Sequence, residues 1–149
     1  MKITIIGTGY VGLTTAVALA FLGHNVQCID QNRALIQNLQ KGHAPIHEPG
    51  LEKLLSYGLP LSFATWDCFE QEADFYFIAV GTPSQDNGAA DLTYVENAAL
   101  QISSHIGKTA SLHVVIKSTV PLGTNKRIYD LINPELQKRN HSTVLTVSS

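Results

Sequence analysis

The chain has 149 residues, a formal net charge of −2, 44% hydrophobic residues and 15% charged residues. This length suits one domain with a buried core, and the balance of apolar and charged residues excludes an intrinsically disordered chain. The weakly acidic charge argues against nucleic acid or an anionic membrane as a partner, and the longest apolar run, 16–22, is too short to cross a bilayer.

The first half of the chain alternates short β-branched runs with segments whose apolar residues recur at helical spacing. It begins with "KITII", a run typical of a buried parallel strand. The predicted elements are, in order, strand 2–6, helix 10–23 ended by Gly23, strand 25–30, helix 33–42, a Pro-rich loop 44–50, helix 51–58 and strand 61–64.

The second half continues the alternation. Its predicted elements are a helical turn 67–73 capped by Asp67, strand 74–81, a polar loop 82–92, helix 94–106, strand 112–117, loop 118–124, helix 125–133 and strand 143–149. Thr93 and Glu96 have the spacing of a capping box at the start of helix 94–106. Pro134 is expected to break or kink the helix before it.

Strands that alternate with helices indicate βαβ units and therefore a parallel sheet. Six strands in this arrangement predict an α/β fold, a doubly wound (Rossmann) sheet with strand order 3-2-1-4-5-6, formed by residues 1–149 as one domain. Ligands of such sheets bind at the carboxyl ends of the strands. Polar and glycine-rich segments that follow the predicted strands are therefore the candidates for ligand binding.

A GxGxxG pattern, Gly7, Gly9 and Gly12, joins the first strand to the first helix. Such glycines permit a tight turn, close approach of a pyrophosphate to the backbone, and close packing of helix on strand, and the helix N-terminus offers free N–H groups. Asp30 ends the next strand, where it can accept hydrogen bonds from both hydroxyls of an adenosine ribose. This favours NAD, and the nearby Arg33 leaves NADP disfavoured rather than excluded.

Further polar loops follow the later strands. "VGTPS" contains Thr82 and Pro83, and "KSTVPLGT" contains Ser118 and Thr119, whose hydroxyls lie at a strand end. Function concentrates on loops at this edge of a sheet, although such segments are also common as plain loops. The glycine loop alone would also fit another α/β protein, such as a methyltransferase with an adenosine-bearing cofactor.

Four segments together resemble the NAD-binding part of the UDP-glucose/GDP-mannose dehydrogenase family. They are "IIGTGYVGLTTAVALAFLGHNVQCID", "APIHEPGLEKLL", "FIAVGTPSQDNGAADLTYV" and "VVIKSTVPLGT", which cover nearly the whole chain in the same order. "KSTVPLGT" and "PIHEPGLE" are more specific than the glycine motif, and "KSTVPLGT" argues against a methyltransferase. "PIHEPGL" is most similar to family members that act on UDP-glucose.

The resemblance implies a role for individual residues. The pyrophosphate of NAD would be held by Gly7, Gly9, Tyr10, Val11 and Gly12, and its adenosine ribose by Asp30. Thr82, Pro83 and Ser118 would line the cofactor cleft, and Thr119 would lie near the reacting carbon and the attacking water, as a catalytic residue. Glu48 would fall near the cleft edge or be a solvated loop carboxylate. Leu35 stands where members often carry a basic residue, and Arg33 is the nearest cation.

The resemblance also implies an activity: oxidation of a nucleotide sugar's primary alcohol to a carboxylate, with two NAD reduced and a cysteine thioester formed on the way. In the family, the nucleophilic cysteine, the substrate lysine and asparagine, and the central helix with its dimer contacts lie beyond the segments matched here. We therefore expect a fragment that binds NAD without turnover, from a homo-oligomeric parent. A dehydrogenase for UDP-N-acetylmannosamine or GDP-mannose, or an NAD-binding module without activity, is the alternative.

The cysteines and histidines do not suggest another chemistry. Cys28 lies within a predicted strand and Cys68 at the start of a predicted helical turn, and neither has a nearby base in the sequence. The two cysteines fit no motif and the N-terminus lacks a signal-peptide pattern, which favours a reducing cytoplasm. The six histidines lack metal-ligand spacing, so no metal site is expected.

Overall fold

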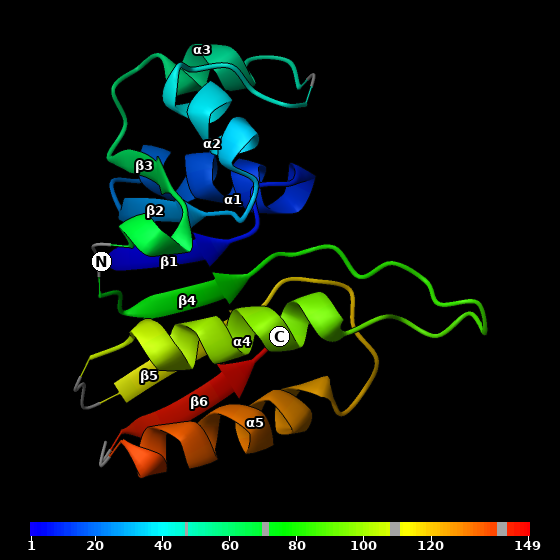
Figure 1. The fold of residues 1–149 in the computed structure, drawn as a ribbon. Helices are drawn as coiled ribbons and strands as arrows, with labels where there is room; N and C mark the ends of the chain where they lie inside the picture. Colours follow the sequence, from blue (N-terminus) through cyan, green and yellow to red (C-terminus); the bar gives the residue numbers. More distant parts are fainter. Residues whose placement is uncertain (47, 70–71, 108–110, 140–142) are drawn as a thin grey trace.

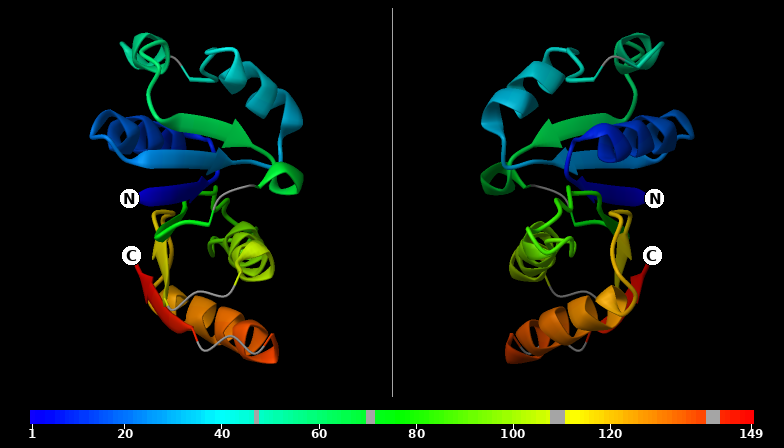
Figure 2. Two further views of the ribbon diagram at one scale, coloured as in Figure 1. Left: turned by 90° about the vertical axis from the view of Figure 1, so that its left-hand side faces the viewer. Right: turned by 90° about the vertical axis from the view of Figure 1, so that its right-hand side faces the viewer.

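A computed structural model of the chain describes residues 1–46, 48–69, 72–107, 111–139 and 143–149. Six parallel strands form one sheet in the order β3-β2-β1-β4-β5-β6, flanked by helices (Figures 1 and 2). The predicted doubly wound fold is confirmed. The elements are β1 Lys2–Ile6, α1 Tyr10–Phe21, β2 Asn25–Ile29, α2 Arg33–Gln40, α3 Leu51–Leu55, β3 Leu61–Ala64, the 3-10 turn η1 Trp66–Cys68, β4 Phe75–Ile78, α4 Thr93–His105, β5 Ser111–Ile116, α5 Thr124–Lys138 and β6 Val144–Ser148.

The alternation of side chains along the strands divides the core into two sides. On β1, Ile3 and Ile5 pack with Ala16 and Ala20 of α1, and α1 continues through Leu13 into a cluster with α2 and α3. The opposite side is covered by α4 and α5, which pack on β4 and β5. β1 is therefore buried on both sides, as expected for a parallel sheet, whereas β4 alternates buried residues with the half-buried Phe75 and Phe77.

Two predicted helix boundaries are wrong. Thr93 is the first residue of α4 and not its cap, because its N–H and its hydroxyl both donate to Oδ1 of Asp91, at 2.9 and 2.6 Å. Glu96 forms an ion pair with Arg127 instead of closing a capping box. Pro134 lies within α5 and does not end it. Ile132 and Leu136, buried before and after the proline, hold the helix on the core.

The helical turn after β3 also differs from its prediction. It covers Trp66–Cys68, with Thr65 at its N-cap, so Asp67 lies inside the turn and not at its start. Residues 70 and 71, the middle of the predicted segment, lie outside the described residues. Asp67 instead receives a hydrogen bond from the Thr65 hydroxyl and one from Arg33, which explains its position.

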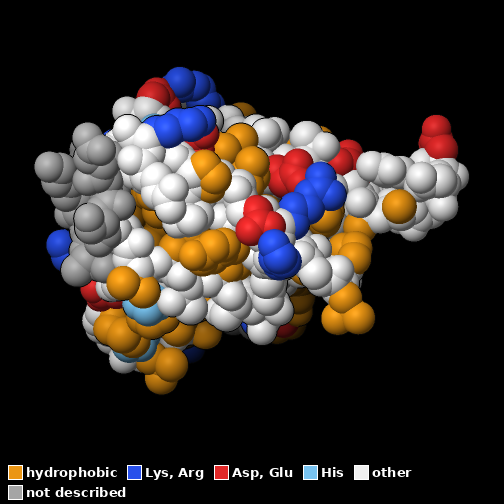
Figure 3. Space-filling model, turned by 90° about the horizontal axis from the view of Figure 1, so that it is seen from below, with side chains coloured by type: hydrophobic (Ala, Val, Ile, Leu, Met, Phe, Trp, Pro, Cys, Tyr) orange, Lys and Arg blue, Asp and Glu red, His pale blue; other side chains and the backbone are white. Residues whose placement is uncertain are grey.

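The described side chains seen from below in Figure 3 include cationic and anionic groups that lie side by side. Two ion pairs involve α5, Lys126 with Asp130 within the helix and Arg127 with Glu96 of α4. The loop between β4 and α4 projects from the body as an arm, closed by an isolated antiparallel bridge between Ser84 and Ala90 (Figures 1 and 3). Within the described part of the chain, no helix is both long and apolar enough to cross a membrane.

Candidate functional site

The three glycines of the loop between β1 and α1 have different physical requirements. Gly7 has a φ of 98°, and a Cβ there would lie 2.7 Å from the carbonyl oxygen of Ala79. A Cβ on Gly12 would lie 1.9 Å from the carbonyl oxygen of Gly7. A Cβ on the exposed Gly9 would meet nothing within 4 Å. Gly7 and Gly12 are therefore needed for packing, whereas Gly9 leaves open space outside the backbone.

This open space adjoins the N-terminus of α1. Gly9 is the N-cap, no side chain caps the helix, and its first turn holds no acidic residue. The N–H of Leu13 bonds to Gly9, so the amides of Tyr10, Val11 and Gly12 precede the first intrahelical bond. Free amides at the positive end of the helix dipole suit an anion, and the open space at Gly9 admits one. The loop therefore fits the pyrophosphate of a dinucleotide.

Asp30 follows β2 directly and is fixed next to the glycine loop. Its Oδ2 accepts the N–H of Thr8 at 2.9 Å and the hydroxyl of Thr8 at 2.8 Å. Its Oδ1 accepts the N–H of Asn32 at 2.9 Å. Because a carboxylate has about four acceptor sites, Asp30 retains capacity for a further donor. Its position suits a ribose hydroxyl beside the glycine loop.

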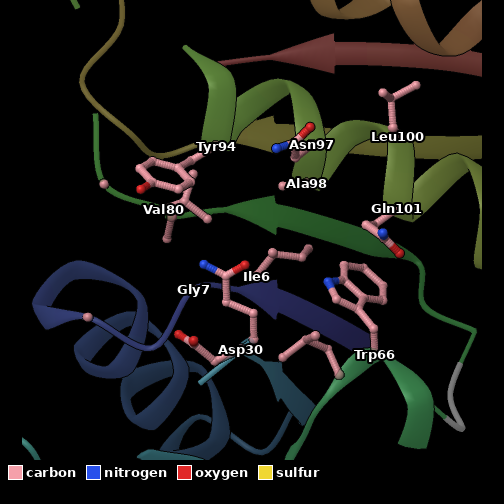
Figure 4. A pocket seen from close by; sticks show the side chains of 15 residues that line it. Ile6, Gly7, Asp30, Trp66, Val80, Tyr94, Asn97, Ala98, Leu100 and Gln101 are labelled. Atoms are coloured by element: carbon pink, nitrogen blue, oxygen red, sulfur yellow. The ribbon is translucent and has the colours of Figure 1, made fainter. Parts of the chain in front are cut away.

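A cavity of about 710 Å³ opens beside Asp30, over the carboxyl ends of β1, β2 and β4. Figure 4 shows Asp30 and Trp66 on one side of it and Tyr94, Asn97 and Gln101 of α4 on the other. The lining residues are Ile6, Gly7, Gly9, Ile29, Asp30, Gln31, Trp66, Ala79, Val80, Gly81, Tyr94, Asn97, Ala98, Leu100 and Gln101. A mixed apolar and polar wall of this size suits an adenosine.

The sequence-based reasoning missed the walls contributed by η1 and α4. The ring of Trp66 packs against that of His105, with their centroids 4.9 Å apart. Tyr94, Asn97 and Gln101 recur at helical spacing on one side of α4, the first helix after the β4 loop. That spacing, on a helix that starts at the ligand edge of the sheet, is the signal that could have identified them.

The two later loops are joined to each other rather than to the cavity. The Thr82 hydroxyl donates to the carbonyl of Thr119 at 2.9 Å, and the Ser118 hydroxyl donates to the carbonyl of Val80 at 2.6 Å. Thr82, Pro83, Ser118 and Thr119 are thus brought together, with the side chains of Pro83 and Thr119 exposed. Of these loops, only Val80 and Gly81 line the cavity itself. Two predicted ligand hydroxyls therefore also hold the loops together.

Other predicted positions lie away from the cavity. Glu48 is exposed in the loop before α3, and Leu35 packs with the cluster beneath α2 and α3. Cys28 is fully buried, and burial raises the pKa of its thiol strongly, with a smaller contribution from Asp30. Cys68 is exposed in η1. Among the described residues, no three His, Cys, Asp or Glu side chains gather as a metal site.

Comparison with known proteins places these features in a family. Residues 1–149 match the UDP-glucose/GDP-mannose dehydrogenase family, NAD binding domain. UDP-glucose 6-dehydrogenases of Bacillus subtilis and Pseudomonas aeruginosa are 46% identical over 140 residues and 38% identical over 153 residues. These alignments cover 91% and 100% of this chain but 31% and 33% of the relatives, so the chain spans about a third of their length.

Solved structures agree with this assignment. A GDP-mannose dehydrogenase of Pseudomonas aeruginosa, solved as a ternary complex, superposes with a TM-score of 0.88 at 35% identity. The match covers 99% of this chain and 35% of the dehydrogenase. A UDP-glucose dehydrogenase of Pyrobaculum islandicum superposes with a TM-score of 0.81 at 38% identity, and the match covers 99% of this chain and 35% of that enzyme. The chain therefore belongs to the UDP-glucose/GDP-mannose dehydrogenase family and forms its NAD-binding domain.

Proposed function

We propose that this chain holds NAD for the oxidation of UDP-glucose to UDP-glucuronate, a reaction that reduces two NAD. The observation that carries the proposal is the placement of Asp30 between the open glycine loop and the cavity. The sugar is suggested by the names of the relatives that are 38–46% identical and by the segment "PIHEPGL". A GDP-mannose dehydrogenase at 35% identity keeps GDP-mannose as a second candidate substrate, ahead of UDP-N-acetylmannosamine, for which the similar structures are 28% identical.

In this proposal the amides at the start of α1 bind the pyrophosphate, and Asp30 accepts hydrogen bonds from the adenosine ribose. The adenosine occupies the cavity against Trp66 and α4. Thr82 and Ser118 hold the two later loops together on the nicotinamide side, and Thr119 is the proposed catalytic residue that orients water. NAD, when bound, supplies the acceptor for the hydride of the substrate alcohol.

The cysteines of this chain do not provide the thiolate that the second oxidation requires. Cys28 is buried and its raised pKa keeps the thiol protonated, whereas Cys68 is an exposed thiol on η1 and does not line the cavity. We therefore propose that these 149 residues bind NAD and do not turn over UDP-glucose by themselves. A binding module without activity is the second candidate for the chain alone.

The test combines equilibrium binding with an assay of NADH formation. The purified chain is titrated with NAD by calorimetry and then incubated with NAD and UDP-glucose, GDP-mannose or UDP-N-acetylmannosamine while NADH absorbance is followed. Binding of NAD without NADH formation is the expected result. Absence of NAD binding would overturn the proposed cofactor role, and steady NADH formation would overturn the proposal that this chain alone does not oxidise the sugar.

We also propose that the parent enzyme is a homo-oligomer in a reducing cytoplasm, where it supplies an acidic sugar for polysaccharide synthesis. This setting rests on the family and on the unpaired cysteines.

A further inference from the structure

Arg33, the cation nearest to Asp30 in the sequence, has a partner of its own. Its Nη2 lies 2.8 Å from Oδ2 of Asp67, with both side chains largely exposed, at 70% and 53%. Arg33 begins α2, three residues after Asp30, whereas Asp67 lies in η1 next to Trp66. Asp30 and Trp66 both line the cavity. The ion pair therefore connects the two segments that flank the ribose side of the cavity.

Asp67 is itself held in place. Its Oδ1 accepts the hydroxyl of Thr65, a buried residue, at 2.5 Å. This hydrogen bond, followed by the one from Arg33, lowers the pKa of the Asp67 carboxyl, so the group is ionised at neutral pH. A fixed anion thus engages the guanidinium of Arg33 at the edge of the candidate site.

We propose that Asp67 is a specificity-determining residue that favours NAD over NADP. The inference rests on the proposed NAD site, with the adenosine ribose at Asp30. Enzymes that accept NADP commonly use an arginine at this place to bind the 2′-phosphate. Here the guanidinium of Arg33 is engaged by Asp67, whose neighbour Trp66 lines the cavity together with Asp30. A 2′-phosphate at the adenosine ribose would have to compete with Asp67 for Arg33.

The size of the effect follows from the exposure of the pair. An exposed ion pair is a weak competitor because water and salt screen its charges, so the change of Asp67→Asn is expected to tighten NADP binding only about three- to tenfold. NAD has no 2′-phosphate, and its affinity is expected to stay within about twofold. The asparagine keeps an acceptor for Thr65, which protects the local fold. Asp67→Ala is the second variant if the asparagine disturbs it.

The experiment titrates NAD and NADP into the chain, into Asp67→Asn, and into Asp67→Asn combined with Arg33→Gln, at one ionic strength. Asp130→Asn is the matched control, because Asp130 is an exposed carboxylate paired with Lys126 at 2.5 Å on α5, and its loss changes the net charge equally. We expect Asp67→Asn to bind NADP more tightly than the unaltered chain and Asp130→Asn to bind it with unchanged affinity. The gain in NADP affinity should disappear when Arg33→Gln is added to Asp67→Asn.

The possible failures are distinguishable. If the unaltered chain does not bind NAD, both the proposed function and this inference are overturned. If NAD binds but Asp67→Asn binds NADP as Asp130→Asn does, only the inference is overturned. Equal tightening of NAD and NADP, or a gain that persists without Arg33, would also overturn it, since Asp67 would then act without selecting the 2′-phosphate through Arg33.

Discussion

Asp30 and Thr8 are joined by two hydrogen bonds, one from the backbone N–H of Thr8 at 2.9 Å and one from its hydroxyl at 2.8 Å. Thr8 stands between Gly7 and Gly9 and is fully buried. The carboxylate at the end of β2 is thereby fixed to the glycine loop that follows β1. A dinucleotide that contacts the loop with its pyrophosphate would meet Asp30 with its adenosine ribose.

Replacement of Asp30 by alanine is expected to weaken NAD binding. The loss of hydrogen bonds to a charged group costs about 1.5–3 kcal/mol, which is about a 10- to 150-fold loss of affinity. The affinity for NADP should fall less, because the repulsion between Asp30 and the 2′-phosphate of NADP disappears at the same time. Calorimetric titration with both dinucleotides measures the two effects, and unchanged affinity for both would contradict the role of Asp30.

Substitutions of Gly9 and Gly12 by valine are expected to have opposite consequences. Gly9→Val should leave the fold intact, since its Cβ has open space, and should abolish NAD binding by filling the place of the pyrophosphate. Gly12→Val should destabilise the fold, since its Cβ would overlap the carbonyl of Gly7. Circular dichroism and NAD titration on the same samples separate the effects. Normal NAD binding by Gly9→Val would mean that the loop is only a turn.

The two thiols are expected to differ in reactivity. Cys68 is exposed, whereas Cys28 is buried with a raised pKa, so it stays protonated throughout the neutral range and lacks access to reagents. A thiol reagent should modify one cysteine in the folded chain and two after unfolding in guanidinium. Cys68→Ser is the control and should not react when folded. Rapid modification of both thiols in the folded chain would contradict the buried position of Cys28.

Two buried threonines provide a matched test of the packing around β1. Thr4 and Thr8 are both fully buried, but the hydroxyl of Thr4 has no hydrogen-bond partner among the described residues, whereas that of Thr8 bonds to Asp30. Thr4→Val should raise the free energy of unfolding by about 1 kcal/mol, and Thr8→Val should lower it by about 1–2 kcal/mol. Urea unfolding measures both. Destabilisation by Thr4→Val would show that its hydroxyl is satisfied.

Local signals were sufficient for the strands and the glycine loop. The run Lys2–Ile6 and the glycines after it act through neighbouring residues, so spacing alone indicates a strand, a turn and a helix start. The strand order follows from alternation and the handedness of crossovers, and the structure confirms it. The site residues assigned from the resemblance stay predictions until NAD binding is measured.

The predictions failed mainly where contacts between distant parts of the chain determine the structure. Pro134 disfavours a helix locally, but the packing of Ile132 and Leu136 keeps α5 continuous. At the start of α4 the deciding contact is local instead, because Asp91, two residues before Thr93, accepts the N–H that Glu96 would accept in a capping box. The cavity wall at Trp66 and Gln101 joins side chains that lie far apart in the sequence, so no local pattern could pair them.

Trp66, the only tryptophan in the chain, lines the cavity and therefore reports on its occupation. The most direct test is a titration of the chain with NAD that follows Trp66 fluorescence, with the Gly9→Val variant as the control for absorption by the dinucleotide. We predict a saturable change of emission in the unaltered chain that the variant lacks. A chain that responds like its variant over the whole titration would contradict the claim that this cavity, beside Asp30 and the glycine loop, holds NAD.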